Sequence, residues 1–400
     1  MSGERRVAHD PAERPFVVVW ETDGGEAKPP ERELDAAEAR ELVRQVAAFG
    51  RPTPLFVVSG ADPFRRDDLP GLIAYGTGLG VRTALDPTGA PELGGEQLRA
   101  VRDAGAVGLV LGLDGATAEP HDTVRGLPGA HRRTLDAWDT ARALGMKVRI
   151  DTAVSRRNLR ELPDLVRLAD RHGATLWSAC FPVPAEPERA PCALTAREVE
   201  DVLNFVHDAG LAVPVKTTGA HHFRRVALQR RILADRGDDH VAVLGLGPLY
   251  RELHDRALTL GLGTRTRPPL DADADRGYVH VSPTGTVHPS GCLPLSAGNV
   301  RRSTLTSLYR TSPLFTGLRA PGMLGGRCGA CEFRRVCGGS RSRAYGVTGD
   351  PYAEEPWCAY QPGSFPHRRE LAKALAARYA RPRPAKPPFA ARRAEEEWSL

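Results

Sequence analysis

The chain has 400 residues, enough for one large α/β domain with a sizeable core and a smaller module. Its formal net charge of +6 is modest, and much of the excess lies in the tail ARYARPRPAKPPFAARRAEEEW. A solvated surface explains such a charge better than a nucleic-acid interface, for which no recognition motif is present. No apolar run approaches the length of a membrane span, and residues 1–14 lack the apolar segment of a signal peptide. We therefore expect a cytoplasmic protein with no membrane partner, in which clustered cysteines are metal ligands rather than disulfides.

Apolar, strand-like runs alternate with amphipathic helical patterns between residues 15 and 217. Continuous Val, Leu and Ile strands separated by helices are typical of a parallel sheet covered on its outside. Most of the helical patterns end in glycine, the expected C-terminal stop. About six such units predict an α/β fold, a partial or complete TIM-like (β/α) barrel with its chemistry at the C-terminal ends of the strands. The expected strands are 15–20, 54–59, 81–85, 107–113, 147–154, 174–181 and 211–217.

Beyond residue 217 the regular alternation ends. A basic helix is expected in TTGAHHFRRVALQRRILADR, and residues 234–276 show no firm periodicity, which indicates a variable linker or lid. The pattern YVHVSPTGTVHPSG predicts a β-hairpin turning at a Pro-Thr-Gly sequence, and LTSLYRTSPLFTGLR predicts a helix. The expected units are a flexible N-terminus (1–14), the barrel (15–217), the basic helix and linker (218–277), a cysteine-rich module (278–362), and a C-terminal helix with a Pro/Arg-rich tail (363–400).

Four cysteines near the C-terminus form the most informative pattern in the chain. They are arranged as Cys-x2-Cys-x5-Cys with a fourth cysteine downstream, and are Cys328, Cys331, Cys337 and Cys358. Two cysteines separated by two residues can grip a metal centre from a single turn. Four thiolates suit an iron–sulfur cluster or a tetrahedral zinc. The scattered Cys180 and Cys192 are interpreted as a buried and a loop cysteine.

Several segments together resemble the radical S-adenosylmethionine (SAM) enzymes with a C-terminal SPASM/Twitch module. They are the barrel, HPSGCLPLSAGNVR, LTSLYRTSPLF and CGACEFRRVCGGSRSRAYGVTGD, and the resemblance covers residues 15–362. GLDGATAEPHDTVRG is similar to that family's SLDG…HD..RG segment. VKTTGAHHFRRVALQRR resembles a subgroup close to the tetrapyrrole-modifying members, which act on porphyrin propionates.

The resemblance implies one auxiliary 4Fe–4S cluster as a cofactor, held by Cys328, Cys331, Cys337 and Cys358. Cys358 is preferred as the fourth ligand because its spacing matches the family's module, and Cys292 beside the hairpin is the alternative that could approach the same centre. A further auxiliary site would want a cysteine where Arg341 stands, so we expect only one cluster.

The resemblance fails at the site that cleaves SAM. Radical SAM enzymes carry Cys-x3-Cys-x2-Cys just after the first strand, and those thiolates hold the 4Fe–4S cluster whose open iron binds SAM. Here the strand PFVVVWE runs into TDGGEAKPPERELDAAEA, and no cysteine precedes Cys180. The carboxylates of this shorter segment are hard ligands that replace thiolates poorly on iron–sulfur centres, and they are Glu21, Asp23 and Glu26.

The expected SAM pocket is reduced as well. The family's SAM-amine motif survives only as SGADP, and Gly112 stands where SLDG has a hydroxyl. A vestigial pocket remains in Gly60, Asp62 and Asp114, although Asp114 is also expected to pair with Arg125 at a strand end. The sequence therefore predicts no catalytic residues for SAM cleavage and leaves the binding of SAM open.

The basic helix carries a second candidate site. His221, His222, Arg224 and Arg225 are suited to an anionic small molecule or peptide, and they suit a solvated helix face equally well. Both interpretations stay open at this stage.

Three functions from different classes remain. The first is a degenerate radical SAM relative that keeps its auxiliary cluster for a binding, scaffold or electron-relay role beside an active radical SAM enzyme or another redox partner. The second is a working SAM-dependent enzyme that modifies a peptide or tetrapyrrole. The third is a structural zinc protein whose four cysteines serve folding alone.

Overall fold

The computed structural model describes residues 10–22, 32–89, 93–183, 194–263 and 277–379. Ten strands form one sheet in the order β10-β9-β8-β1-β2-β3-β4-β5-β6-β7. Strands β1 to β7 are parallel neighbours in chain order, and β8 joins the free edge of β1, also in parallel. These strands are β1 Val17–Thr22, β2 Leu55–Gly60, β3 Arg82–Pro87, β4 Ala106–Gly112, β5 Lys147–Ala153, β6 Leu176–Cys180, β7 Val215–Thr218, β8 Tyr278–Val281, β9 Thr286–His288 and β10 Gly298–Asn299.

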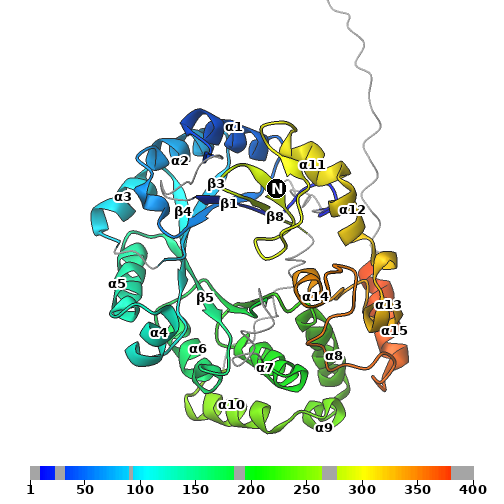
Figure 1. Cartoon of the computed structure of the whole chain (residues 1–400). Helices are drawn as coiled ribbons and strands as arrows, with labels where there is room; N and C mark the ends of the chain where they lie inside the picture. The colour runs from blue at the N-terminus through cyan, green and yellow to red at the C-terminus, as the bar shows by residue number, and fades with distance from the viewer. Residues whose placement is uncertain (1–9, 23–31, 90–92, 184–193, 264–276, 380–400) are drawn as a thin grey trace, which may run out of the picture.

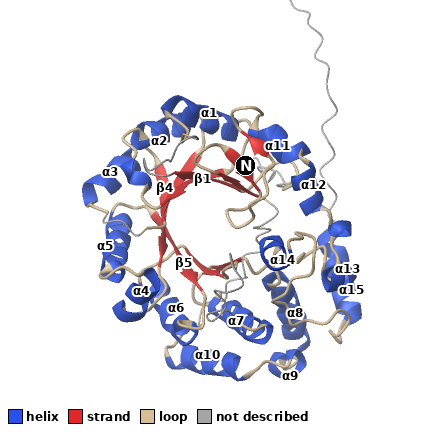
Figure 2. Ribbon diagram, in the orientation of Figure 1, coloured by secondary structure: helices blue, strands red, loops and turns tan. Residues whose placement is uncertain are grey.

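Helices cover the outside of this sheet, and Figures 1 and 2 show them as a ring around the strands. Since β7 and β10 are the two ends of the strand order, the sheet is a partial barrel, and the sequence-based fold prediction is confirmed. The ring contains α1 Ala36–Ala47, α2 Leu69–Gly78, α3 Gly95–Asp103, α4 Ala118–Arg125, α5 Ala130–Ala143, α6 Leu162–Arg171, α7 Ala196–Ala209, α8 Phe223–Arg236, α9 His240–Leu244 and α10 Pro248–Thr259.

The C-terminal helices lie along the arc that runs from α1 to α8 past the open side of the barrel (Figure 1). A second, smaller core joins α8 and α15 to the cysteine loops through Leu233, Phe333 and Leu371. The helices here are α11 Leu305–Thr311, α12 Pro313–Arg319, α13 Gly326–Ala330, α14 Arg341–Thr348 and α15 Arg368–Tyr379.

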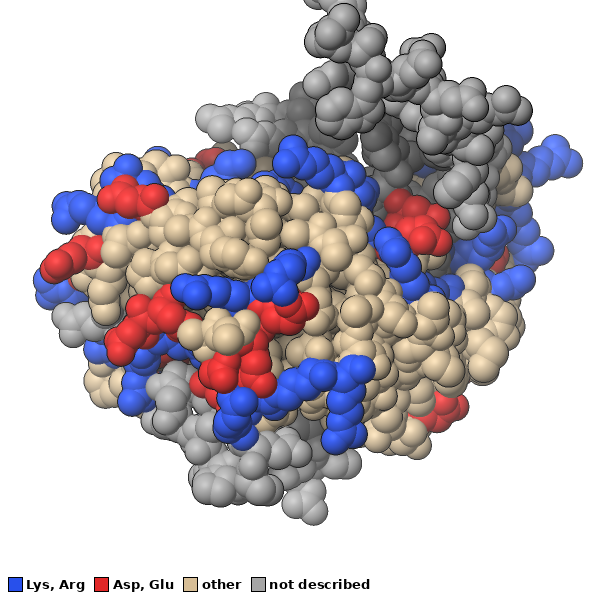
Figure 3. Space-filling model, turned by 90° about the horizontal axis from the view of Figure 1, so that it is seen from above, with Lys and Arg blue, Asp and Glu red and all other residues tan. Residues whose placement is uncertain are grey.

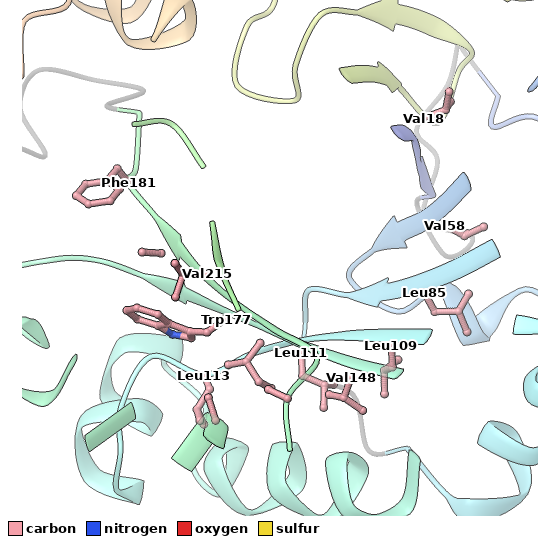
Figure 4. Close-up of a cluster of buried hydrophobic side chains, with 14 of the residues drawn as sticks. Val18, Val58, Leu85, Leu109, Leu111, Leu113, Val148, Trp177, Phe181 and Val215 are labelled. Atoms are coloured by element: carbon pink, nitrogen blue, oxygen red, sulfur yellow. The ribbon is translucent and has the colours of Figure 1, made fainter. Parts of the chain in front are cut away.

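The main core lies between the strands and the helices. Alternate residues of a strand point to opposite faces, so the apolar strands supply both this layer and the barrel interior. Figure 4 shows the outer set along successive strands, including Val18, Val58, Leu85, Val148 and Trp177. The inner set is a small apolar plug of Val19, Val57 and Ala84, packed against Val17, Leu55 and Tyr278. The plug leaves the C-terminal ends of the strands for polar side chains, as in other β/α barrels.

Two expected segments differ from the structure. Residues 240–259, expected within a linker, form α9 and α10, and α10 buries Tyr250 and Leu253 against the barrel helices. The single helix expected over residues 305–319 is two helices, because Ser312 ends α11 and caps α12 by accepting a hydrogen bond from the Leu314 N–H at 3.3 Å. Proline at the first position of α12 suits such a new start.

The N-terminal segment is more ordered than expected from residue 10 onward. Tyr309 donates to the Pro11 carbonyl, Arg319 donates to the Ala12 carbonyl at 3.1 Å, and Arg310 donates to the Glu13 carbonyl at 2.8 Å. Residues 10–14 are therefore fastened to α11 and α12, and the expectation of a flexible end over 1–14 is wrong for this part.

Charge is distributed over the surface in both signs. On the face seen in Figure 3, basic and acidic side chains lie interspersed rather than gathered into one basic patch. None of the helices that the structure describes is long and apolar enough to cross a bilayer.

Candidate functional site

Four cysteines line one small cavity in the C-terminal module: Cys328, Cys331, Cys337 and Cys358. Cys328 lies in α13, which ends at Cys331 as the backbone becomes extended, so both thiols come from one tight turn. A side chain at Gly329 would place its Cβ 2.2 Å from the Leu324 carbonyl oxygen, which makes glycine necessary inside this turn. The local sequence thus builds the half of the site that Cys-x2-Cys spacing predicts.

Backbone groups surround the sulfurs on the opposite side. The chain turns after Cys337 through Gly338 and Gly339, whose φ angles of 77° and 66° favour glycine. The Gly339 N–H donates to Cys337 Sγ at 3.4 Å, and the Glu355 N–H donates to Cys328 Sγ at 3.3 Å. Such N–H···S contacts are among the means by which proteins tune iron–sulfur clusters.

Two opposing effects act on the pKa values of the cysteines in the cavity: burial raises them, and the positive charge of the buried Arg225 lowers them. Burial raises the pKa of Cys331 to about 11 and that of Cys337 to about 12, so the metal-free protein holds thiols there. The positive charge of Arg225 opposes this effect, and its own charge is neutralised by Glu200 through hydrogen bonds of 2.8 and 2.6 Å. Metal binding requires the thiolate forms and displaces these protons.

The donor set of four thiols suits either a tetrahedral zinc or an iron–sulfur cluster. Within the part of the chain that the structure describes, no three His, Cys, Asp or Glu side chains are placed to hold one metal ion. A tetrahedral zinc needs all four sulfurs within about 2.3 Å of one atom, whereas a 4Fe–4S cluster takes one thiolate at each iron. Four thiols that line one shared cavity could supply one ligand for each iron of such a cluster.

Two other residues weighed for this centre have different places. Cys292 is exposed and lines a neighbouring pocket rather than the cysteine cavity. Arg341 is buried and donates to the carbonyls of Pro351 at 2.9 Å and Ala353 at 2.7 Å, with Nη2 at 4.0 Å from Cys328 Sγ. Arg341 is therefore a cation with a structural role beside the cavity.

The four candidate anion-binding residues lie on α8 and on the turn before it, and they face two different cavities. His221 and Arg224 line the neighbouring pocket, whereas His222 and Arg225 are buried and line the cysteine cavity. Residues three apart share a helix face, which explains both pairings. Burial lowers the pKa of His222 to about 4, so its ring is neutral at neutral pH. The four residues do not form one site, and a solvated face is wrong for His222 and Arg225.

The neighbouring pocket has a volume of about 440 Å³ and lies between the barrel and the cysteine module. Its inner end is formed by the C-terminal ends of β5 to β7 and by Tyr278 of β8, and its outer wall by the hairpin, α12 and the loop after Cys337. Arg224 and Arg319 supply positive charge, and Phe181 and Phe315 supply apolar surface. Because Cys337, Gly338 and Gly339 line both spaces, a ligand here would lie beside the cysteine cavity.

The three residues of the expected SAM pocket are occupied by contacts within the chain. A side chain at Gly60, whose φ is +144°, would place its Cβ 2.3 Å from the Thr22 carbonyl oxygen. Asp62 caps a short 3-10 turn by accepting from the Phe64 N–H at 3.1 Å. Asp114 accepts from the Ala153 N–H at 2.7 Å and lies 2.7 Å from Arg125. The expected Asp114–Arg125 pair is present.

Arg125 also fills the space that a larger residue at position 112 would need. A Cβ built on Gly112 would lie 1.7 Å from Arg125 Nη2. The hydroxyl that SLDG would supply there is thus replaced by a guanidinium, which also donates to the Thr88 carbonyl at 3.1 Å.

Sequence reasoning missed a set of polar residues inside the barrel. Arg149 forms a close bidentate ion pair with Asp151, and Cys180 Sγ lies 3.7 Å from the same carboxylate. Burial, and then the charge of Asp151, raises the pKa of Asp86 to about 6. The signal was the alternation in β5, where Arg149 and Asp151 alternate with the buried Val148, Ile150 and Thr152.

Near β1, His280 lies 3.2 Å from Glu21, at the side of the barrel where a SAM-cleaving cluster would be held. The chain offers no thiol ahead of Cys180, so the residues present do not fit that cluster. Asp23, Glu26 and Cys192 lie outside the described residues.

Comparison with known proteins gives a consistent set of relatives, although no family model matches the chain. An AdoMet-dependent heme synthase of Methanosarcina barkeri (strain Fusaro / DSM 804) is 32% identical over 366 residues, covering 87% of this chain and 97% of that protein. A pre-heme d1 synthase of Dinoroseobacter shibae is 27% identical over 344 residues, and the match covers 82% of this chain and 78% of that protein. Among solved structures, Streptococcus suis SuiB bound to S-adenosylmethionine aligns with a TM-score of 0.61 at 14% identity, covering 87% of this chain and 78% of SuiB. The similarity between this chain and SuiB is a similarity of fold.

Proposed function

The chain belongs to the radical SAM proteins with a C-terminal SPASM module, in the subgroup of the haem-synthase relatives, and we propose that it is an iron–sulfur protein that keeps one auxiliary 4Fe–4S cluster without cleaving SAM. One contrast carries this proposal. Four cysteines surround a common cavity near the C-terminus, whereas the segment after the first strand has no thiol at all. This contrast supports a chain that has the ligands for an auxiliary cluster and lacks those for a SAM-cleaving cluster.

Cys328, Cys331, Cys337 and Cys358 would hold the cluster, which supplies one-electron transfer when bound. The N–H groups of Gly339 and Glu355 stabilise thiolate charge, and Arg225 with Glu200 adds a buried pair of no net charge. Four protein ligands leave no open iron position for SAM at this centre.

The role that fits this arrangement is electron relay or ligand binding beside a redox partner. The pocket of about 440 Å³ shares a wall with the cluster site and combines apolar surface with Arg224 and Arg319. That combination suits a flat, largely apolar molecule with carboxylates, and the relatives are named for haem and pre-haem d1 synthesis. A tetrapyrrole with propionate groups is thus the ligand class that we favour, with an active radical SAM enzyme as the partner.

Metal analysis after anaerobic reconstitution tests the cluster directly. We expect about four irons and about four acid-labile sulfides per chain with a brown absorbance, lost together in Cys331→Ala. Stoichiometric zinc without sulfide would instead support a structural zinc protein. Cys292→Ala is the matched control, because that thiol lines the pocket and should leave the iron content unchanged.

A second candidate is a working SAM-dependent enzyme acting on a tetrapyrrole. The observation in its favour is that the match covers 97% of the length of the heme synthase. Production of 5′-deoxyadenosine separates the two candidates, because only the second requires it.

A further inference from the structure

His222 is a buried histidine whose ring has no visible partner. Its exposed fraction is 0%, and neither ring nitrogen has a hydrogen-bond partner within the part of the chain that the structure describes. A buried polar group without a hydrogen-bond partner is destabilising and rare in folded proteins, so an unpaired ring in a core position calls for an explanation. His222 lines the cavity of the four cysteines, where a bound group would meet it.

The acceptors around His222 are already committed to other donors. Glu355 accepts from Arg343 at 3.0 Å and from the Ser340 N–H at 2.6 Å, and Glu200 holds Arg225 through both of its oxygens. Among the residues described, no hydrogen bond joins the His222 ring to either carboxylate.

A second donor faces the same space. Arg225, one turn beyond His222, also lines the cysteine cavity, and its Nε is buried without a hydrogen-bond partner among the residues described. Its other nitrogens bind Glu200 and Gln229. Two unpaired N–H groups on one helix stripe, both beside four cysteines, indicate that the cavity is built for a group rich in acceptors. The inorganic sulfides and thiolates of an iron–sulfur cluster are such acceptors.

We propose that His222 donates a ring N–H to a sulfur of the cluster and thereby raises its reduction potential. This inference rests on the proposed function, since it needs the 4Fe–4S cluster to be present. A hydrogen bond to sulfur stabilises the more negative, reduced state more than the oxidised state, which is why such bonds shift potentials upward. His222 is a positioning and tuning residue here, and the four thiolates remain the ligands.

The first test compares reduction potentials of the reconstituted full-length protein in anaerobic titrations followed by electron paramagnetic resonance. His222→Leu removes the donor, His222→Gln restores an N–H group, and His172→Leu is a matched control on a ring that packs against Trp138 instead. We expect His222→Leu to lower the reduced-to-oxidised ratio at a fixed potential about tenfold, equal to ~59 mV for one electron. We expect His222→Gln to recover most of this shift and His172→Leu to match the native protein. An unchanged midpoint in His222→Leu at full cluster content would overturn the proposal.

A second test does not depend on whether His222→Leu holds the cluster. Native protein carrying ¹⁵N-labelled histidine is reduced and examined by pulsed electron paramagnetic resonance. A weak nitrogen coupling that disappears in His222→Gln supports a hydrogen bond. Absence of coupling, or the strong coupling of a directly bound nitrogen, contradicts it. Iron and sulfide counts are taken on the same samples, so a native chain that assembles no cluster refutes the proposed function separately and removes the basis of this inference.

Discussion

Arg343 fastens the cysteine module to the barrel. Its side chain is fully buried, pairs with Glu355 at 3.0 Å, donates to the Phe181 carbonyl at 3.1 Å, and lies over the ring of Trp357 at 4.0 Å. Phe181 directly follows β6, so one side chain connects a strand end of the barrel to the loop between Cys337 and Cys358. The relation between the pocket and the cysteine cavity depends on this residue.

Replacing Arg343 by Met should therefore destabilise the protein by about 3–5 kcal/mol, because Glu355 would remain as a buried carboxylate without its cation. Urea denaturation followed by tryptophan fluorescence measures the loss. The double variant Arg343→Met, Glu355→Leu should recover part of it, and Arg132→Met, at an 88% exposed side chain, should change little. Equal stability of Arg343→Met and Arg132→Met would show that the module docks by other contacts.

Gly112 is the position in the expected SAM pocket where the structure leaves least room for a larger residue. Replacing it by Ser would place Cβ within 1.7 Å of Arg125 Nη2 and should displace the guanidinium from Asp114. We expect a loss of about 1–3 kcal/mol, typical of overpacking, and no gain of SAM cleavage. Thermal melting measures this loss against Gly71→Ser, where a Cβ has nothing within 4 Å. A variant as stable as that control would indicate that Arg125 moves aside freely.

At the level of elements, strands β1, β2 and β4 were predictable because each is a short run rich in Val and Leu beside a helical pattern that ends in glycine. The cysteine turn was equally visible, since spacing alone places Cys328 and Cys331 together. Helix α10 was missed because its fold depends on partners distant in sequence rather than on its own apolar periodicity. The division of His221 and Arg224 from His222 and Arg225 likewise needs the structure, since it depends on which neighbours pack against each stripe.

Asp208 of α7 is one of the residues, distant in sequence, on which the packing of α10 depends. This carboxylate of α7 accepts from Arg230 of α8 at 2.6 Å and from Tyr250 of α10 at 2.7 Å. Burial alone would raise its pKa, but hydrogen bonds from His207, His254 and Tyr250 and the charge of Arg230 lower the pKa well below its ordinary 3.8. Three helices are thus joined at one ionised group.

Asp208→Asn should cost about 2–3 kcal/mol at pH 7, in the range of hydrogen bonds to charged groups. Because the folded pKa lies below 3.8, the contribution is fully present above that pH and is lost as pH falls through the folded value. The difference from native protein should shrink in acid, as measured by denaturation at several pH values. A difference that does not vary with pH would contradict the linkage, and Asp136→Asn, at a 72% exposed side chain, serves as control.

At the scale of the whole molecule, the chain should not need its last twenty residues in order to fold. The segment RPRPAKPPFAARRAEEEWSL combines prolines and charges with few apolar groups that could be buried. Removing residues 381–400 should leave the melting temperature within about 1–2 °C of the full chain, as for a surface change in a protein of this size. A large drop in melting temperature would mean that these residues dock on the folded part.

Under the proposed function, the barrel holds no SAM-cleaving cluster and the C-terminal module holds an auxiliary one. The measurement that tests this most directly is the chromatographic assay of 5′-deoxyadenosine, after the reconstituted, reduced protein is incubated with SAM. Cleavage needs an electron delivered through an iron that binds SAM itself, and neither the thiol-free segment after Trp20 nor the fully ligated auxiliary centre offers one. We predict no 5′-deoxyadenosine above a protein-free control, in native protein and in Cys331→Ala alike. Multiple turnovers by the native protein would contradict the account and establish a working SAM-dependent enzyme.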